Sequence, residues 1–576
     1  MISAGDGHGD KAAPRTTFWQ LFKPKVFTVL AEGYGLAHLR NDAVAGLTVA
    51  VVALPLAMAL AIASGTTPDK GLVTAVVAGF LISALGGSRF QVGGPTGAFV
   101  VVVFNVIAEH GYDGLLLATL MAGLMLVAAG LMRFGTWIKY IPEPVVTGFT
   151  AGIAVIIFAS QLKDLFGLAP ESLPADFLPK LHALWSARDT FDAATFAVAG
   201  TALAAILLLR RHAPRVPAFL VAVVGASLVV WALGLPVETV GSRFGEIPSS
   251  LPLPSLPVFS LAQAVEVLPA AFTIAFLAGI ESLLSAMVAD GMTGARHRSN
   301  CELVAQGVAN TASACFGGLP ATGAIARTAT NIRSGARSPV AGMLHAVFLL
   351  AFMLIAAPLA AFVPLASLAA VLVIVAWNMS EIDKFRHLLS APPGDAVVLL
   401  VTFGLTVMVD LTVAIQVGVV MAAILFMHRM AQVVQVEKGV GFLQGDVDDA
   451  QMPALDYAFQ DLPAGVEMFS LRGPLFFGAA RSLRDALDAM PVPPRVFILR
   501  MRNVPMIDSS GVAALSDFIR RCRAKGVAVI VSGIRPQPMD VLVRMGFDGS
   551  HDNLRLAENF AAAREMAAGM IEAGVA

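Results

Sequence analysis

The chain has 576 residues, of which 57% are hydrophobic and only 14% are charged, and its formal net charge is −1. Soluble globular proteins average about 45–50% apolar and about 25% charged residues, so this composition excludes a soluble enzyme, a disordered chain and a nucleic-acid binder that relies on bulk positive charge. The three cysteines, Cys301, Cys315 and Cys522, are far apart and odd in number, which argues against a disulfide framework or a zinc site. We therefore expect an integral membrane protein without a bound metal or other cofactor.

The charged residues are unevenly distributed. Residues 431–576 carry 32 charged side chains in 146 positions, whereas residues 1–430 carry 47 in 430, so a long charge-poor body precedes a short body of soluble composition. The N-terminal residues are polar and basic without a compact apolar stretch, so no cleavable signal peptide is expected. We expect a cytoplasmic N-terminal segment, a transmembrane domain, a linker and a cytoplasmic soluble domain over residues 1–39, 40–430, 431–460 and 461–576.

Charge-free stretches near the length of a membrane-spanning helix recur throughout the first body. A spanning helix needs about 20 mostly apolar residues. The stretch 338–380 is long enough for two helices and carries a proline-rich break, and 303–326 is interrupted by two glycines and a proline. Dividing these two predicts fourteen spans from the stretches 43–68, 71–88, 90–108, 114–132, 144–162, 193–209, 216–237, 267–280, 303–326, 338–380, 396–409 and 411–428.

Basic residues fall mostly in every second loop. The loops after odd-numbered spans are poor in them, apart from the longer loop 163–192. Because basic loops stay on the cytoplasmic side, the pattern predicts that both termini are cytoplasmic, and the alternation agrees with fourteen spans. The basic residues of the even-numbered loops are Arg133, Lys139, Arg210, Arg211, Arg215, Arg296, Arg298, Arg333, Arg337, Lys384 and Arg386.

The third and tenth spans open with similar segments. Residues 93–98 read GGPTGA and residues 317–324 read GGLPATGA, and because the spans are seven apart they would cross the membrane in opposite directions. Inverted repeats interrupted at matching positions are typical of the midplane binding site of a transporter. Glycine and proline permit an extended segment that ends in a half-helix, whose N-terminus carries free N–H groups and about half a positive charge. The pattern favours an anion site between the segments, with helix kinks or close helix packing as the alternative.

Two ionisable residues lie within predicted spans. Arg327 falls about one turn into the second half-helix, and Glu281 falls within the eighth span, which continues to Asp290. Charged residues at such depth usually face the bundle interior and pair or conduct an ion. We interpret Arg327 as an anion-attracting charge. A buried carboxyl group can exchange protons near neutral pH, so Glu281 is interpreted as a proton or cation site, with a static Glu–Arg or Glu–backbone contact as the alternative. Ser285, one turn on, would be a second ligand if the ion were sodium.

Beyond about residue 440, short strands alternate with helices, which predicts an open α/β domain. The predicted strands are 466–473, 496–501 and 527–533, and the predicted helices are 478–490, 509–526, 538–547 and 558–570. Asp508, Ser509, Ser510 and Gly511 fall at a strand-to-helix turn. Helix capping is the main interpretation of this turn, with phosphorylation or nucleotide contact as the alternative.

Several long segments are similar to one known family. Over roughly residues 36–570 the chain resembles the sulfate permease (SulP) family, the bacterial relatives of solute carrier family 26, and its second body resembles a STAS domain. The segments are RNDAVAGLTVAVVALPLAMALAIASG (40–65), QVGGPTGAF (91–99), PEPVVTGFTAGIA (142–154), ESLLSAMVADGMTGARHRSNCELVAQGVAN (281–310), GGLPATGAIARTATNIRSGARSP (317–339), LFFGAA (475–480) and MIDSSGVAAL (506–515).

This resemblance implies an α-helical multi-pass membrane protein with a 7+7 inverted repeat, like that of the uracil transporters, followed by a small α/β STAS domain. Spans 1–4 and 8–11 would form a core and spans 5–7 and 12–14 a gate, with the anion between the two half-helices. From the residues themselves, Glu281 and Ser285 are the candidate coupling-ion residues, and Ser509 and Ser510 are candidate regulatory residues of the second body. The implied substrate-binding residues are Leu56, Thr96, Gly97, Ala98, Phe99, Gly323, Ala324, Ile325, Ala326 and Arg327.

Two positions depart from patterns within the family. Members often have Pro-Gln in the first span, whereas this chain has Pro55-Leu56, which looks more like the bicarbonate and dicarboxylate branch. Sodium-coupled bicarbonate members carry Asp and Thr where this chain has Glu281 and Ser285, and the Glu looks more like the proton-coupled members.

Residues and resemblance together predict a secondary active transporter of small inorganic or carboxylate anions of the bicarbonate, dicarboxylate or sulfate class. We expect proton symport by alternating access, in a homodimer in the plasma (bacterial inner) membrane. The alternatives are a sodium-coupled bicarbonate symporter, an anion exchanger and a non-transporting anion sensor. The expected partners are the anion, a proton or sodium, the lipid bilayer and a second copy of the chain, but no nucleic acid. Neither body carries a catalytic constellation, so enzymatic activity is not expected.

Overall fold

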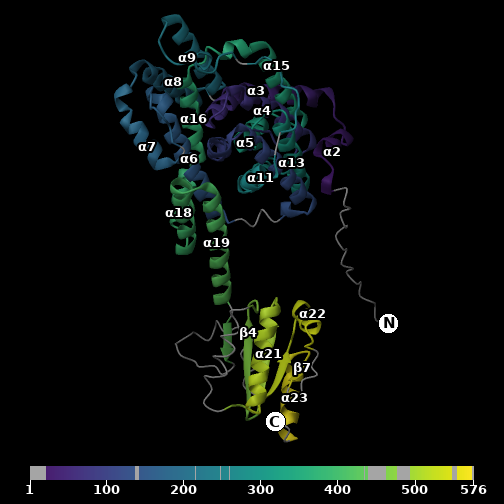
Figure 1. Ribbon diagram of the computed structural model, residues 1–576. Coiled ribbons are helices and arrows are strands. Elements are labelled where there is room, and N and C mark those ends of the chain that lie inside the picture. The colour runs from purple at the N-terminus through teal and green to yellow at the C-terminus, as the bar shows by residue number, and fades with distance from the viewer. Residues whose placement is uncertain are drawn as a thin grey trace. The chain divides into compact units, whose positions relative to one another are not determined.

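The computed structural model divides into two compact units, Met1–Val420 and Met421–Ala576, which are described separately (Figure 1). The described residues are 21–136, 142–174, 176–213, 216–246, 248–257, 260–433, 435–438, 462–476, 493–547 and 554–573.

Long apolar helices make up the part of the chain before residue 434. Among the described residues, nine helices are long and apolar enough to cross a membrane, and α9 and α18 are shorter apolar helices. The predicted helical multi-pass fold is therefore confirmed, whereas the number of fourteen crossings stays a prediction. The longer helices are α3 (Leu36–Ala63), α4 (Pro68–Leu85), α5 (Val100–Leu131), α6 (Glu143–Phe166), α8 (Ala193–His212), α9 (Ala218–Leu233), α12 (Leu268–Thr293), α13 (Ser299–Cys315), α15 (Val340–Ala360), α16 (Leu365–Met379), α18 (Pro393–Met408) and α19 (Leu411–Val433).

The predicted interruptions coincide with breaks in the helices. Gly111 has a φ of +71° inside α5, which separates the stretch that ends at residue 108 from the one that begins at 114. The proline-rich break in 338–380 lies between α15 and α16. The interrupted stretch 303–326 contains the end of α13, a two-residue strand and the start of the short helix α14 (Ile325–Arg333).

Several short helices connect the long ones and were not predicted from the sequence. They carry few apolar residues in a row, so hydropathy does not reveal them. They are α2 (Lys25–Ala31), α7 (Phe177–Ser186), α10 (Val240–Phe244), α11 (Leu261–Glu266) and α17 (Ile382–Leu389), with the 3₁₀ turns η2 (Phe134–Thr136) and η4 (Arg188–Thr190).

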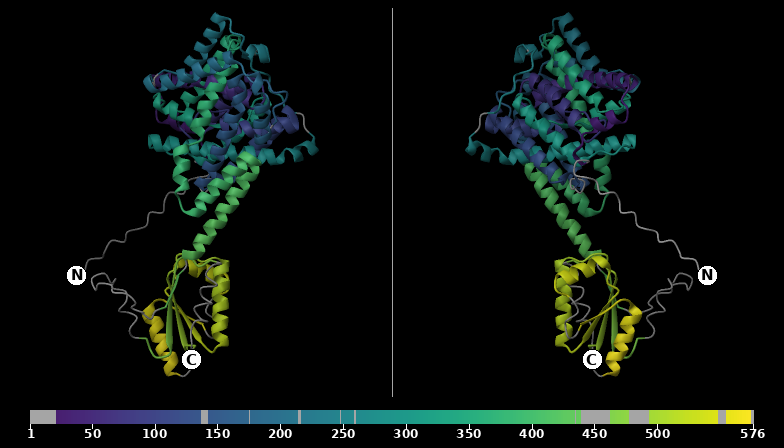
Figure 2. Two further views of the ribbon diagram at one scale, coloured as in Figure 1. Left: turned by 90° about the vertical axis from the view of Figure 1, so that its left-hand side faces the viewer. Right: turned by 90° about the vertical axis from the view of Figure 1, so that its right-hand side faces the viewer.

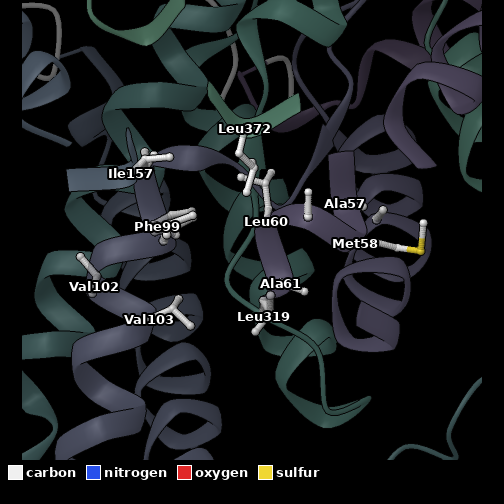
Figure 3. Packing of buried hydrophobic residues seen from close by; sticks show 14 of the residues in the cluster. Ala57, Met58, Leu60, Ala61, Phe99, Val102, Val103, Ile157, Leu319 and Leu372 are labelled. Carbon is white, nitrogen blue, oxygen red and sulfur yellow. The ribbon is translucent and has the colours of Figure 1, made fainter. Parts of the chain in front are cut away.

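The long helices pack in two sets. In the first set, α13 packs against α5, α15 packs against α3 and α4, and α12 contacts α5 and α14. In the second set, α6 contacts α16 and α18, and α8 contacts α9 and α16. Small residues such as Ala57 and Ala61 are fully buried in α3, where they allow close helix packing. Figure 3 shows Ala61 beside Leu319 and Leu60 beside Leu372, in the buried cluster that also contains Phe99 of η1 (Gly97–Phe99).

The second unit contains a five-stranded sheet in the order β3-β4-β5-β6-β7. Only the β3–β4 pair is antiparallel. Alternate residues of the central strands face opposite sides of the sheet: Phe497 and Leu499 pack with α21 and α22, whereas Val496 and Ile498 pack with α23. Figure 2 shows α21 and α23 on opposite faces of the sheet. The elements are β3 (Gln435–Lys438), β4 (Val466–Arg472), β5 (Val496–Asn503), α21 (Ser509–Ala524), β6 (Ala528–Ser532), α22 (Pro536–Arg544), β7 (Leu554–Ala557) and α23 (Phe560–Glu572).

This sheet confirms the α/β domain expected from the sequence. The three predicted strands correspond to β4, β5 and β6, and three of the four predicted helices correspond to α21, α22 and α23. The predicted helix 478–490 lies outside the described residues. The outer strands β3 and β7 were not predicted, because each is only four residues long.

Candidate functional site

The two interrupted segments meet in a short two-stranded sheet. Strand β1 (Gly93–Gly94) runs antiparallel to strand β2 (Thr322–Gly323), with Gly93 opposite Gly323. A helix begins soon after each strand, because η1 leads into α5 on one side and α14 begins at Ile325 on the other. The structure thus brings together the two segments whose sequences are alike.

Neither of these helix starts is capped by a side chain. Thr96 precedes η1 and Ala324 precedes α14, and in this described region neither side chain accepts from the first N–H groups of its helix. Such N–H groups, with the partial positive charge of a helix N-terminus, attract anions. The crossing therefore presents backbone donors from two helices, and Thr96, Gly97 and Ala98 are all buried there.

Arg327 spans the two segments. It is 3% exposed, and its guanidinium donates to the carbonyl oxygens of Gly93, at 3.4 Å from Nη1, and of Pro95. Gly94 has a φ of +143°, and a Cβ there would lie 2.6 Å from Arg327 Nη1, so glycine is needed at this position. A permanent positive charge is thereby held within the crossing.

Helix α12 fixes both segments through polar side chains. The Thr96 hydroxyl donates to Glu281 Oε2 at 3.0 Å, and the Ser285 hydroxyl donates to Thr328 Oγ1 of α14 at 3.1 Å. Glu281 therefore contacts the first segment, and Ser285 contacts the second half-helix and not Glu281 itself. In the described part of the chain, no cluster of three or more His, Cys, Asp or Glu side chains could hold a metal ion.

Apolar residues cover one side of the crossing. Phe99, which Figure 3 shows, is buried, as is Ala98, and half-buried Leu56 of α3 packs against the same cluster. A Cβ on Gly97 would lie 2.6 Å from the Met379 sulfur of α16 and 3.3 Å from Ile157 Cδ1 of α6, so Gly97 allows close approach of these two helices.

The remaining predicted residues of the second segment lie on different sides of the half-helix. Gly323 is buried in β2, Ala324 is buried, and Ile325 is half-buried. Ala326 is exposed and so points away from the packed crossing.

Several polar residues of the crossing were missed in the sequence analysis. Ser282 and Thr322 share a hydroxyl–hydroxyl contact of 2.6 Å, and the Gly323 N–H donates to Ser282 Oγ at 3.1 Å. Gln91 and His345 are buried, and their side-chain amide and ring nitrogen atoms find no hydrogen-bond partner among the described residues. The signal available in the sequence was the occurrence of polar side chains within charge-free spans beside the repeated segments.

The strand-to-helix turn of the second unit has the geometry of a helix cap. The Asp508 side chain accepts from the Gly511 N–H at 2.8 Å at the start of α21. Ser509 and Ser510 are exposed in the first turn. The main interpretation of this turn, helix capping, is confirmed, and a regulatory role for the two serines stays a prediction.

Known proteins match this chain over most of its length. The model of the sulfate permease family matches residues 39–402, and that of the STAS domain matches residues 462–563. The putative sulfate transporter YvdB of Bacillus subtilis (strain 168) is 42% identical over 518 residues, which are 89% of this chain and 95% of that protein. The bicarbonate transporter BicA of Picosynechococcus sp. is 31% identical over 511 residues, which are 87% of this chain and 89% of that protein.

A solved structure shares the overall fold. Murine solute carrier 26 family member A9, an anion transporter in the inward-facing state, superposes with a TM-score of 0.84 over 97% of this chain and 96% of that chain, at 19% identity. The resemblance inferred from the sequence motifs is confirmed by these matches.

Proposed function

The chain belongs to the sulfate permease family of anion transporters, and from this premise we propose that it is a secondary active transporter that carries small anions together with protons. It would work as a homodimer in the plasma membrane, with both termini cytoplasmic. Residues 40–430 would form the transport domain, residues 1–39 and 431–460 the flanking segments, and residues 461–576 a cytoplasmic STAS domain.

The observation that carries the proposal is the crossing of the two interrupted segments beside Arg327 and Glu281. Two uncapped helix starts and one buried guanidinium supply positive potential and N–H donors at the same point. A small anion has the charge and the acceptor atoms that this arrangement lacks. Substrate would contact Thr96, Gly97 and Ala98 on one side and Ala324, Ile325 and Arg327 on the other.

The hydrogen bond between Thr96 and Glu281 offers a route for proton coupling. While Glu281 is ionised, its carboxylate accepts the Thr96 hydroxyl, and its charge repels an anion at the crossing. Protonation removes that repulsion and frees the Thr96 hydroxyl to donate to the anion. Anion and proton would then bind together. The binding site would carry less uncompensated charge while one set of helices, around α3, α4, α12 and α13, moves past the other set, around α6 and α16.

The proposed order of substrates rests on Leu56, because the relatives are named for both sulfate and bicarbonate. Leu56 contributes no hydrogen bond where many family members have a glutamine, and at this position the chain resembles the bicarbonate and dicarboxylate branch of the family. The two relatives compared above are described as a putative sulfate transporter and a bicarbonate transporter. We therefore propose bicarbonate or a small dicarboxylate before sulfate.

Counterflow into liposomes that contain the purified protein tests substrate and coupling together. Bicarbonate, succinate, fumarate, sulfate and chloride are each preloaded, and uptake of the labelled anion is then measured under a pH gradient alone and under a sodium gradient alone. The proposal predicts counterflow with at least one anion and accumulation driven by the pH gradient. Accumulation driven only by sodium would indicate a sodium symporter, counterflow without accumulation would indicate an exchanger, and specific binding without flux would indicate a sensor.

A further inference from the structure

Lys180 is a buried cation outside the crossing. It is 4% exposed, and Arg327 is the only other Lys or Arg in the described part of the chain that is nine-tenths or more buried. Among the described residues, no carboxylate forms an ion pair with Lys180, and its ammonium lies over the Phe104 ring, 5.0 Å from the centroid. Burial lowers the pKa of Lys180, against the opposing effect of Asp176. Burying most of a charged side chain is costly without a counter-charge.

The helix that carries Lys180 points it inward. Lys180 and Leu184, one turn later, are the buried residues of α7, whereas Leu178 and Trp185 on other faces are 59% and 70% exposed. Helix α7 contacts α6 and α18, in the set of helices that contains the Gly97 contacts (Figure 1). A lysine that faces the protein while leucine and tryptophan face outward is the reverse of a water-exposed amphipathic helix.

Phe104 links this cation to the candidate site. It lies on α5, five residues beyond Phe99, which is about 7.5 Å along the helix axis at 1.5 Å per residue. Its ring also approaches Gly65 at the end of α3, where a Cβ would be 3.1 Å away. The ammonium of Lys180 therefore lies beside the first half-helix, about one and a half turns beyond the crossing. This end of the half-helix is the one predicted to face the outside of the membrane.

We propose that Lys180 is a capture site for the transported anion on the outer approach to the crossing. Its ammonium binds a small anion that arrives from outside, before the anion reaches Arg327 and the helix starts. An anion supplies a direct ion pair, which no carboxylate of the described residues forms with Lys180, and a cation held in an apolar surrounding concentrates anions locally. The inference rests on the proposed function and on the predicted orientation.

Transport kinetics at the two membrane faces test this role. Uptake of labelled bicarbonate, succinate and sulfate is measured in right-side-out and inside-out membrane vesicles, using whichever anion the wild type carries. Lys180→Met should raise KM at the outer face about tenfold or more and leave KM at the cytoplasmic face unchanged, which also shows that the variant is folded. Lys180→Arg keeps the charge and should stay within about twofold of wild type.

Two further variants separate anion capture from packing. Phe104→Leu removes the ring but leaves the ammonium, so the outer KM should stay close to wild type. Arg188→Gln removes an exposed cation from the same loop, where Arg188 pairs with Asp189, and should change neither KM. An unchanged outer KM in Lys180→Met, an effect at the cytoplasmic face, or an equal effect of Phe104→Leu would overturn the inference. Absence of wild-type flux with every anion would contradict the proposed function and this inference with it.

Discussion

The Thr96 hydroxyl and the Glu281 carboxylate are joined by a hydrogen bond of 3.0 Å, although 185 residues separate them in the chain. Thr96 directly precedes the first half-helix, and Glu281 lies within α12. This bond places the residue proposed to carry the proton in contact with the segment proposed to bind the anion. A change in the charge of Glu281 would therefore act directly on Thr96, without a long-range rearrangement.

Replacing Arg327 should weaken anion binding strongly. Arg327→Ala removes the buried charge proposed to contact the anion, and one hydrogen bond to a charged group contributes about 1.5–3 kcal/mol, or about ten- to a hundredfold in affinity. Arg327→Lys keeps the charge but loses the forked geometry and should be intermediate. Anion affinity is measured by titration of the purified protein, with size-exclusion chromatography as the folding control. Unchanged affinity for every anion would remove Arg327 from the site.

Enlarging Gly97 should slow transport through its contact with the neighbouring helices. A Cβ there would lie 2.6 Å from the Met379 sulfur, and overpacking of this kind typically costs about 1–3 kcal/mol. Gly97→Ala should lower the transport rate several-fold, and adding Met379→Ala should restore most of it. Gly404→Ala on α18, where no atom lies within 4 Å, is the matched control. Failure of the double variant to recover would show that Met379 does not limit the movement.

Removing residues 441–576 should leave a folded membrane unit. The two units are compact separately, and the charge density changes sharply between them. We expect the shortened chain to insert and to bind anion with affinity within about threefold of the full chain, while its rate or dimerisation changes. Membrane insertion, anion titration and cross-linking measure these properties. A shortened chain that inserts but cannot bind anion would show that the units are not separable.

The Asp508 cap should stabilise the start of α21 locally. Asp508→Ala removes the acceptor for the Gly511 N–H, and loss of such a cap costs typically about 1 kcal/mol. Hydrogen–deuterium exchange of the full chain should show faster exchange over residues 509–524. Ser509→Ala and Ser510→Ala, which alter exposed side chains of the same turn, should not accelerate it. Equal effects of all three variants would argue against a specific capping role.

Short sequence motifs predicted where the helices break, but they did not predict which residues the broken segments contact. The glycine and proline pairs at 93–95 and 317–320 interrupt apolar stretches, and such interruptions can be recognised without knowing the partner segment. The bond from Arg327 to the Pro95 carbonyl joins residues 232 positions apart, and the closeness of Gly97 to Met379 depends on how whole helices pack. Neither is encoded in the periodicity of one segment. Helix α7 escaped prediction because its buried face carries Lys180, so its hydropathy gives no signal of burial.

Proton coupling through Glu281 is tested most directly by uptake into liposomes that contain Glu281→Gln. Glutamine imitates the protonated carboxyl group in size and charge, so the variant should keep anion binding and counterflow. It should lose accumulation driven by a pH gradient, whereas Glu109→Gln, at an exposed position, should accumulate anion as the wild type does. If Glu281→Gln concentrates the anion on a pH gradient as well as the wild type, Glu281 is a structural contact and the proton takes another route.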